Sequence, residues 1–192
     1  MVLALRESAM TACIGLASEL HAWVFPLLSE RIYIPGDPRL MGLIGPDGMF
    51  TWSPDLEKVE RDGIEMDSRA TLEDAKREAF SRLNRILSQY GEIQKEVLTG
   101  RSLLLTGDIV EDRAEIAMAL EYLKSVRYEK LYGLGGNVDA AAADYYHLQT
   151  DDDIALDVMT HMFPADHYFE QKIAYSPEEC RQLAMNISSY WT

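Results

Sequence analysis

The second half of the chain holds two acid–histidine pairs at helical spacing. Asp144 and His147 are three residues apart. Asp157 and His161 are four residues apart. On a helix these spacings place both side chains on one face, where a carboxylate and an imidazole can hold one divalent metal ion. Di-iron helix bundles use a comparable Glu-x-x-His motif on facing helices, so the pattern suggests a metal site with these four residues as ligands.

A metal site of this kind needs further ligands from neighbouring helices. Glu111, Glu115 and Glu121 belong to a predicted helix just before the pairs and could supply carboxylates. The resulting hypothesis is a metal-dependent all-helical enzyme, of the phosphohydrolase or di-metal oxidase type, with a divalent metal ion as its cofactor. Acid–histidine pairs often arise by chance among 32 acidic residues, so a solvated helix face without metal or cofactor is the favoured interpretation.

The glycines from Gly133 to Gly136 could suggest a nucleotide-binding loop. They lack the third glycine of a GxGxxG motif and the lysine of a P-loop. The preceding residues, SVRYEKLY, do not have the pattern of a buried parallel strand. We therefore expect a glycine turn that ends a helix. The sequence also has no GxSxG motif, so no catalytic residue is assigned and a non-enzymatic role is favoured.

Negative charge is concentrated in the same part of the chain. Residues 131–171 contain no lysine or arginine, whereas residues 51–100 hold eight cations against eleven acids. Solubility gains nothing from gathering charge in one place, but an anionic surface steers a basic partner and raises its association rate. Aromatic side chains between the acids are suitable contact residues. The predicted binding residues are Asp139, Asp144, Asp151, Asp152, Asp153, Asp157, Asp166, Glu170, Tyr145 and Tyr168.

These observations favour an acidic binding protein that inhibits a basic target. The formal net charge of −14 disfavours direct binding to nucleic acid or to anionic lipid. The expected partner is a basic protein or a nucleoprotein complex, whose binding groove such a surface could block by imitating spaced phosphates. The competing interpretation is that the acids form only a solvated side of the protein.

The composition is that of a soluble globular protein. The chain has 192 residues, of which 47% are apolar and 26% charged, and we expect a single domain over residues 1–192. Cys13 and Cys180 are too few for a disulfide framework and indicate a reducing, cytoplasmic location. No stretch approaches the ~20 apolar residues of a membrane span, so no membrane association is expected.

The first third of the chain combines one predicted helix with a small sheet. A broad apolar stripe predicts a helix over residues 2–30. Beyond it, we expect a hairpin with strands near 40–44 and 49–53, closed by a turn at Pro46–Gly48. Residues 31–34 are a candidate third strand.

The longest predicted helix covers residues 72–97. Its apolar side chains follow a three-to-four spacing over more than three heptads, which favours packing against another helix. Packing inside the chain is the favoured interpretation. The alternative is a homodimer seam over 72–97, which would make the protein a structural or assembly subunit. The apolar positions are Leu72, Ala79, Leu83, Ile86, Tyr90, Ile93 and Val97.

Capping and breaking signals predict the remaining helices over residues 108–126, 138–149, 152–164 and 177–190. Together these patterns predict an α+β fold that is predominantly α-helical. It would have about six helices and a small β-hairpin or three-stranded sheet near residues 31–53.

Overall fold

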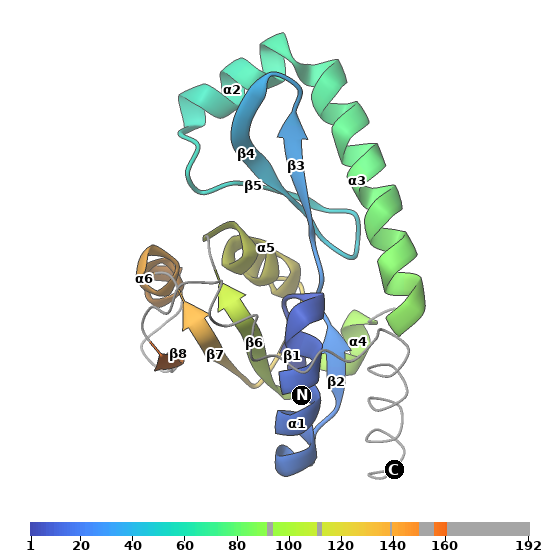
Figure 1. Cartoon of the computed structure of the whole chain (residues 1–192), viewed down its shortest axis with the longest axis vertical. Coiled ribbons are helices and arrows are strands. Elements are labelled where there is room, and N and C mark those ends of the chain that lie inside the picture. The colour runs from blue at the N-terminus through green and yellow to red at the C-terminus, as the bar shows by residue number, and fades with distance from the viewer. Residues whose placement is uncertain (92–93, 111–112, 139, 150–155, 161–192) are drawn as a thin grey trace.

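The structure is a computed structural model, and it describes residues 1–91, 94–110, 113–138, 140–149 and 156–160 (Figure 1). Within these ranges the chain forms an α/β fold with a five-stranded parallel sheet and a three-stranded antiparallel sheet. The predicted predominantly helical fold is therefore wrong, because the larger of the two sheets is a parallel sheet that the sequence patterns did not indicate.

The parallel sheet has the strand order β2-β1-β6-β7-β8. Each neighbouring pair of strands is parallel. The chain builds β1 and β2, leaves the sheet, and returns on the other side of β1 to add β6, β7 and β8. The strands are β1 (Val2–Ala4), β2 (Val24–Pro26), β6 (Ser102–Val110), β7 (Lys130–Val138) and β8 (Leu156–Thr160).

Both faces of the first strand are buried. Val2 and Ala4 pack in a cluster with helix α1 (Met10–Leu20), while Leu3 packs in the cluster around α5 (Arg113–Leu123). A strand buried on both faces reads as a continuous apolar run, without the alternation that marks a half-buried strand. The predicted helix over residues 2–30 is wrong for this reason. Only its middle is helical, as the short 3-10 helix η1 (Glu7–Ala9) and α1.

Three predictions in the second half are also wrong. The glycines from Gly133 to Gly136 lie inside β7, which pairs with β6 along its whole length, and they do not form a helix-ending turn. Leu156–Thr160 is strand β8 rather than part of a helix over 152–164. The expected start of a helix at Asp108 is wrong as well, because β6 continues to Val110. By contrast, the helix predicted over 138–149 is confirmed as α6 (Ala140–Gln149).

The antiparallel sheet confirms the predicted hairpin and third strand. Its order is β3 (Glu30–Ile34), β4 (Asp37–Ile44) and β5 (Phe50–Trp52). Gly48 closes the hairpin with a φ of +76°, a left-handed conformation that glycine adopts without steric strain.

Two helices and a short third one follow the antiparallel sheet. They are α2 (Lys58–Asp67), α3 (Arg69–Tyr90) and α4 (Lys95–Leu98). Leu72, Ala79 and Leu83 of α3 are buried in a cluster with Ile32 and Met41 of the sheet. The apolar seam expected over 72–97 is therefore interrupted after Tyr90, and these positions of α3 pack inside the chain.

Helix α5 lies between the two sheets (Figure 1). Ile116, Ala119 and Leu123 belong to the core of the parallel sheet. Met118, only 2% exposed, lies against Gly45 at the end of β4. A helix covered on nearly every side is apolar all round, which explains the low amphipathicity of this segment. None of the described helices is both long enough and apolar enough to cross a membrane.

Candidate functional site

The parallel sheet has one topological switch point, between β1 and β6. From β1 the chain continues to β2 on one side, and from β6 it continues to β7 and β8 on the other. The connecting helices α1 and α5 therefore lie on opposite faces of the sheet. In open α/β sheets, the crevice at the carboxyl ends of the two strands beside such a point is the usual ligand-binding position.

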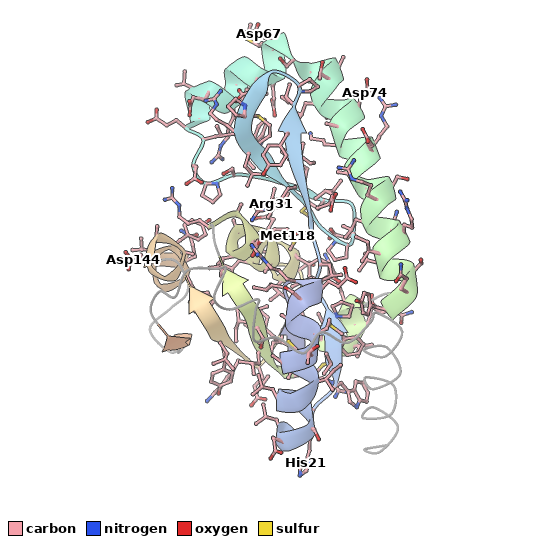
Figure 2. The ribbon with its side chains drawn as sticks, in the orientation of Figure 1. His21, Arg31, Asp67, Asp74, Met118 and Asp144 are labelled. Carbon is pink, nitrogen blue, oxygen red and sulfur yellow. The ribbon has the colours of Figure 1, made fainter. Side chains whose placement is uncertain are left out.

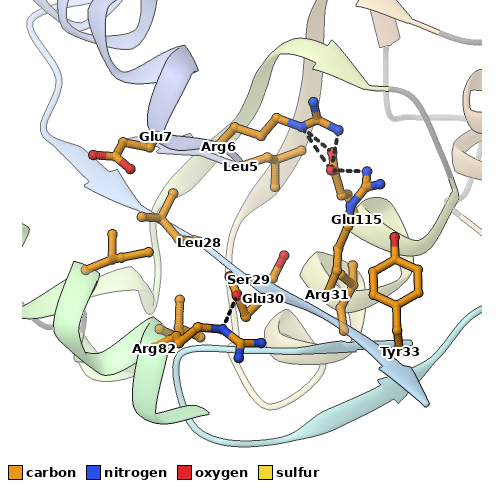
Figure 3. Close-up of a pocket in the computed structure, with 13 residues that line it drawn as sticks. Leu5, Arg6, Glu7, Leu28, Ser29, Glu30, Arg31, Tyr33, Arg82 and Glu115 are labelled. Atoms are coloured by element: carbon orange, nitrogen blue, oxygen red, sulfur yellow. Dashed lines mark hydrogen bonds and ion pairs between the residues drawn. The ribbon is translucent and has the colours of Figure 1, made fainter. Parts of the chain in front are cut away.

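A pocket opens at this position, beside the antiparallel sheet (Figure 3). Its volume is about 540 Å³. We call it the switch-point pocket. It is lined by Leu5, Arg6, Glu7, Leu28, Ser29, Glu30, Arg31, Tyr33, Leu43, Arg82, Leu83, Ile86 and Glu115.

Glu115 lies between two arginines at one end of the pocket. The Nε and Nη2 atoms of Arg6 donate to Glu115 Oε1 at 2.9 and 2.5 Å, and Arg6 Nε also lies 3.0 Å from Oε2. Arg31 Nη2 donates to the same Oε1 at 3.3 Å. The side chain of Glu115 is 6% exposed, against 21% for Arg6 and 35% for Arg31. Figure 3 shows the two guanidinium groups on either side of the carboxylate, and Figure 2 places Arg31 between the two sheets.

Three separate elements position this cluster. Arg6 lies two residues after the end of β1, Arg31 is on β3, and Glu115 is in the first turn of α5. A carboxylate in the first turn of a helix is stabilised by the helix dipole, which adds to the two guanidinium contacts. The cluster therefore joins the parallel sheet, the antiparallel sheet and the helix between them.

A second ion pair lies on another wall of the pocket. Arg82 of α3 donates to Glu30 Oε1 at 2.7 Å and to Glu78 Oε1 at 2.9 Å. Glu7 accepts a hydrogen bond from the Tyr90 hydroxyl at 2.8 Å. The contact between Arg82 and Glu30 attaches α3 to β3, so it holds the strand that carries Arg31.

The rest of the lining is largely apolar. Leu5 and Leu28 come from the ends of β1 and β2, Leu43 comes from β4, and Leu83 and Ile86 come from α3. Tyr33 adds an aromatic ring that is 46% exposed. An apolar wall with a few convergent charged groups is the usual composition of a small-molecule site.

The acidic residues predicted as a binding surface fall mostly outside the described residues. Asp144 is exposed on α6, and Tyr145 beside it is half-buried. Asp157 is in β8, in register with Leu134. Tyr146, the next residue after Tyr145, is buried. This burial, together with the neighbouring Tyr128, raises the pKa of the Tyr146 hydroxyl. The predicted residues outside the described ranges are Asp139, Asp151, Asp152, Asp153, Asp166, Tyr168 and Glu170.

The structure does not agree with part of the geometry assumed for the alternative metal site. Asp157 lies in a strand, so the helical spacing assumed for Asp157 and His161 does not apply, and His161 lies outside the described residues. Glu115 contacts arginines, and Glu121 pairs with Lys124. Across the described residues no group of three or more histidine, cysteine, aspartate or glutamate side chains could hold a metal ion.

The sequence interpretation missed the arginines of the pocket. Arg6 directly follows the buried run VLAL, which is where a strand reaches the edge of its sheet. Glu115 is the one charged residue in the apolar run AEIAMAL. A charge placed in an otherwise buried element is the signal that could have indicated these two residues, because burying it requires a partner.

A solved structure shares this fold. The crystal structure of TT1426 from Thermus thermophilus is similar to the chain with a TM-score of 0.68, and the match covers 96% of this chain and 86% of that one. The two sequences are 16% identical, so the similarity supports the fold and nothing further. No family model matches the chain. No curated protein matches it significantly.

Proposed function

We propose that the protein binds a small organic molecule with one anionic group on an apolar body, in the switch-point pocket. The observation that carries this proposal is the convergence of Arg6 and Arg31 on one end of a pocket at the topological switch point, whose lining combines apolar and charged side chains. Neither a catalytic group nor a cofactor is needed for binding of this kind.

The size of the pocket supports a small ligand. Sites for small molecules usually have volumes of about 300–1,000 Å³ and are apolar with a few placed polar groups. At about 540 Å³ the switch-point pocket lies within this range. Its leucine and isoleucine side chains can cover an aliphatic or aromatic body, while Tyr33 offers a ring at the rim.

The charges of the pocket support an anionic group at one end. Arg6 and Arg31 contribute two positive charges and share Glu115, which contributes one negative charge. A guanidinium group binds carboxylates and phosphates through paired, charge-assisted hydrogen bonds. Of the remaining lining charges, Glu30 pairs with Arg82, and Glu7 accepts a hydrogen bond from Tyr90. The anionic group is expected beside Arg31, because Arg31 is more exposed than Arg6 and its contact with Glu115 is the longer one.

Replacing Arg31 by glutamine should weaken binding of phenyl phosphate and octanoate by about tenfold or more, because a charge-assisted hydrogen bond is lost. Isothermal titration calorimetry with the purified chain measures this change. Phenol and octanol, which lack the anionic group, should bind both proteins equally.

The matched control is Arg77→Gln, since Arg77 lies on α3 with its side chain 77% exposed and pairs with Asp74. This variant should bind the anions as the natural protein does. An equal loss in both variants would reject a specific role for Arg31. Absence of any binding to the natural protein across aryl and alkyl carboxylates, sulfonates and phosphates would reject the proposal.

The acidic-surface interpretation stays a second proposal, favoured by one observation on α6. Asp144 is exposed, and Leu148, one turn later, is 81% exposed. An acidic helix that also presents a large apolar side chain suits contact with a basic protein.

Changing Asp151, Asp152 and Asp153 together to lysine should then weaken binding to poly-L-lysine at low salt by severalfold, and added salt should remove the difference. Biolayer interferometry at two salt concentrations measures this effect. The same reversal of Asp62, Glu65 and Asp67 on α2 changes the net charge equally and is the control. Equal losses in the two triple variants would show that total charge, and not the 131–171 segment, controls binding.

A further inference from the structure

We infer that Glu115 controls the ligand charge that the switch-point pocket accepts, because its carboxylate competes with the ligand's anionic group for Arg31. This inference rests on the proposed function and assigns a specificity-determining residue to the same site. It predicts that removal of the Glu115 charge strengthens binding of a doubly charged ligand more than binding of a singly charged ligand of the same shape.

The contacts of Glu115 with the two arginines are unequal. Arg6 donates to both carboxylate oxygens, at distances from 2.5 to 3.0 Å. Arg31 reaches one oxygen at 3.3 Å, which is longer than the 2.7–2.9 Å typical of charge-assisted hydrogen bonds. The contact with Arg31 is therefore the weaker one, and it is the one that a ligand can exchange.

Burial keeps the Glu115 carboxylate in place during this exchange. Its side chain is 6% exposed and belongs to α5, a helix packed on both sheets. A buried carboxylate that lost Arg6 would be left with little solvation, so it remains with Arg6 when a ligand binds. A ligand anion at Arg31 then lies close to the Glu115 carboxylate, and like-charge repulsion in this partly buried position lowers its affinity.

The repulsion increases with the charge of the ligand. Benzenesulfonate has one negative charge, whereas phenyl phosphate at pH 8 has nearly two, because the second pKa of a phosphomonoester is about 6. Removing the Glu115 charge should therefore strengthen binding of phenyl phosphate more than binding of benzenesulfonate. Glutamine keeps a hydrogen-bond acceptor at this position, so the comparison can be made on a folded variant.

Glu115→Gln removes the charge but keeps the size and a hydrogen-bond acceptor. We expect this variant to bind phenyl phosphate about tenfold more tightly than the natural protein, with a smaller gain for benzenesulfonate. Adding Arg31→Gln to Glu115→Gln should abolish the gain. The control is Glu121→Gln, on the same helix at a position that pairs with Lys124, and it should leave both affinities unchanged. Calorimetry at pH 8 gives the affinities, and a thermal melt confirms that each variant is folded.

The outcomes separate the inference from the proposed function. Tighter binding of phenyl phosphate by Glu115→Gln, dependent on Arg31, supports both, even if the natural protein binds this ligand too weakly to measure. Equal binding by the natural protein and Glu115→Gln, lost in Arg31→Gln, keeps the proposed function and overturns the inference. An equal gain for benzenesulfonate and phenyl phosphate in Glu115→Gln also overturns it. Absence of binding in every protein overturns both.

Discussion

Replacing Arg6 by methionine should lower the free energy of unfolding by about 3 kcal/mol, because it leaves the Glu115 carboxylate buried without its main partner. Arg6 donates to both oxygens of Glu115, whereas the contact from Arg31 is 3.3 Å long. Methionine keeps the unbranched apolar stem of arginine, so little packing is lost with the charge. Urea denaturation followed by circular dichroism measures the change.

A double-mutant cycle identifies the cause of this loss. Glu115→Gln alone should cost about 1 kcal/mol, since glutamine still accepts a hydrogen bond from Arg6. The double variant should cost about 2 kcal/mol, less than Arg6→Met alone, because no buried charge is left unpaired. Costs that simply add in the double variant would mean that Arg6 acts through packing rather than through Glu115.

This cluster shows why the site was only partly predictable. The sequence contains the two features that matter at Arg6 and Glu115, a charge at the end of one apolar run and a charge inside another. Their separation of 109 residues hides the pairing, because it depends on β6 returning beside β1. No hydrophobic periodicity or short motif in the sequence predicts that β6 returns to lie beside β1. Arg31 reaches the same point from a different sheet, at a distance of 84 residues.

The elements of the fold also differ in how well the sequence predicts them, because local patterns indicate some and distant pairings determine others. The hairpin around Gly48 was predictable because turn residues act locally, and β4 and β5 pair directly across the turn. The seam of α3 was predictable because one face is apolar and the other polar, although its partner is a sheet rather than a helix. Strand β1 was missed because burial on both faces removes its alternation. Strand β7 was missed because its glycines indicate a turn, although its residues from Lys130 to Gly133 alternate between exposed and buried.

Gly42 links the fold to the pocket, and Gly42→Ala should lower the free energy of unfolding by about 3 kcal/mol through overpacking. A Cβ atom at this position would overlap the carbonyl oxygen of Thr51 and come within 2.8 Å of the Phe50 ring. Both neighbours belong to β5, the strand that pairs with β4 at Gly42. Leu43, the next residue, lines the switch-point pocket, so ligand binding should weaken as well. Urea denaturation and calorimetry measure the two effects.

The matched control is Gly63→Ala in the middle of α2. A Cβ atom at Gly63 has no atom within 4 Å, so no overlap arises. Alanine has a higher helix propensity than glycine, and this variant should be more stable by about 0.5–1 kcal/mol. It should leave ligand binding unchanged, because α2 does not line the pocket. If Gly42→Ala is as stable as Gly63→Ala, then close contact between β4 and β5 is not what requires glycine at position 42. If it also binds the ligand normally, then the substitution does not disturb Leu43.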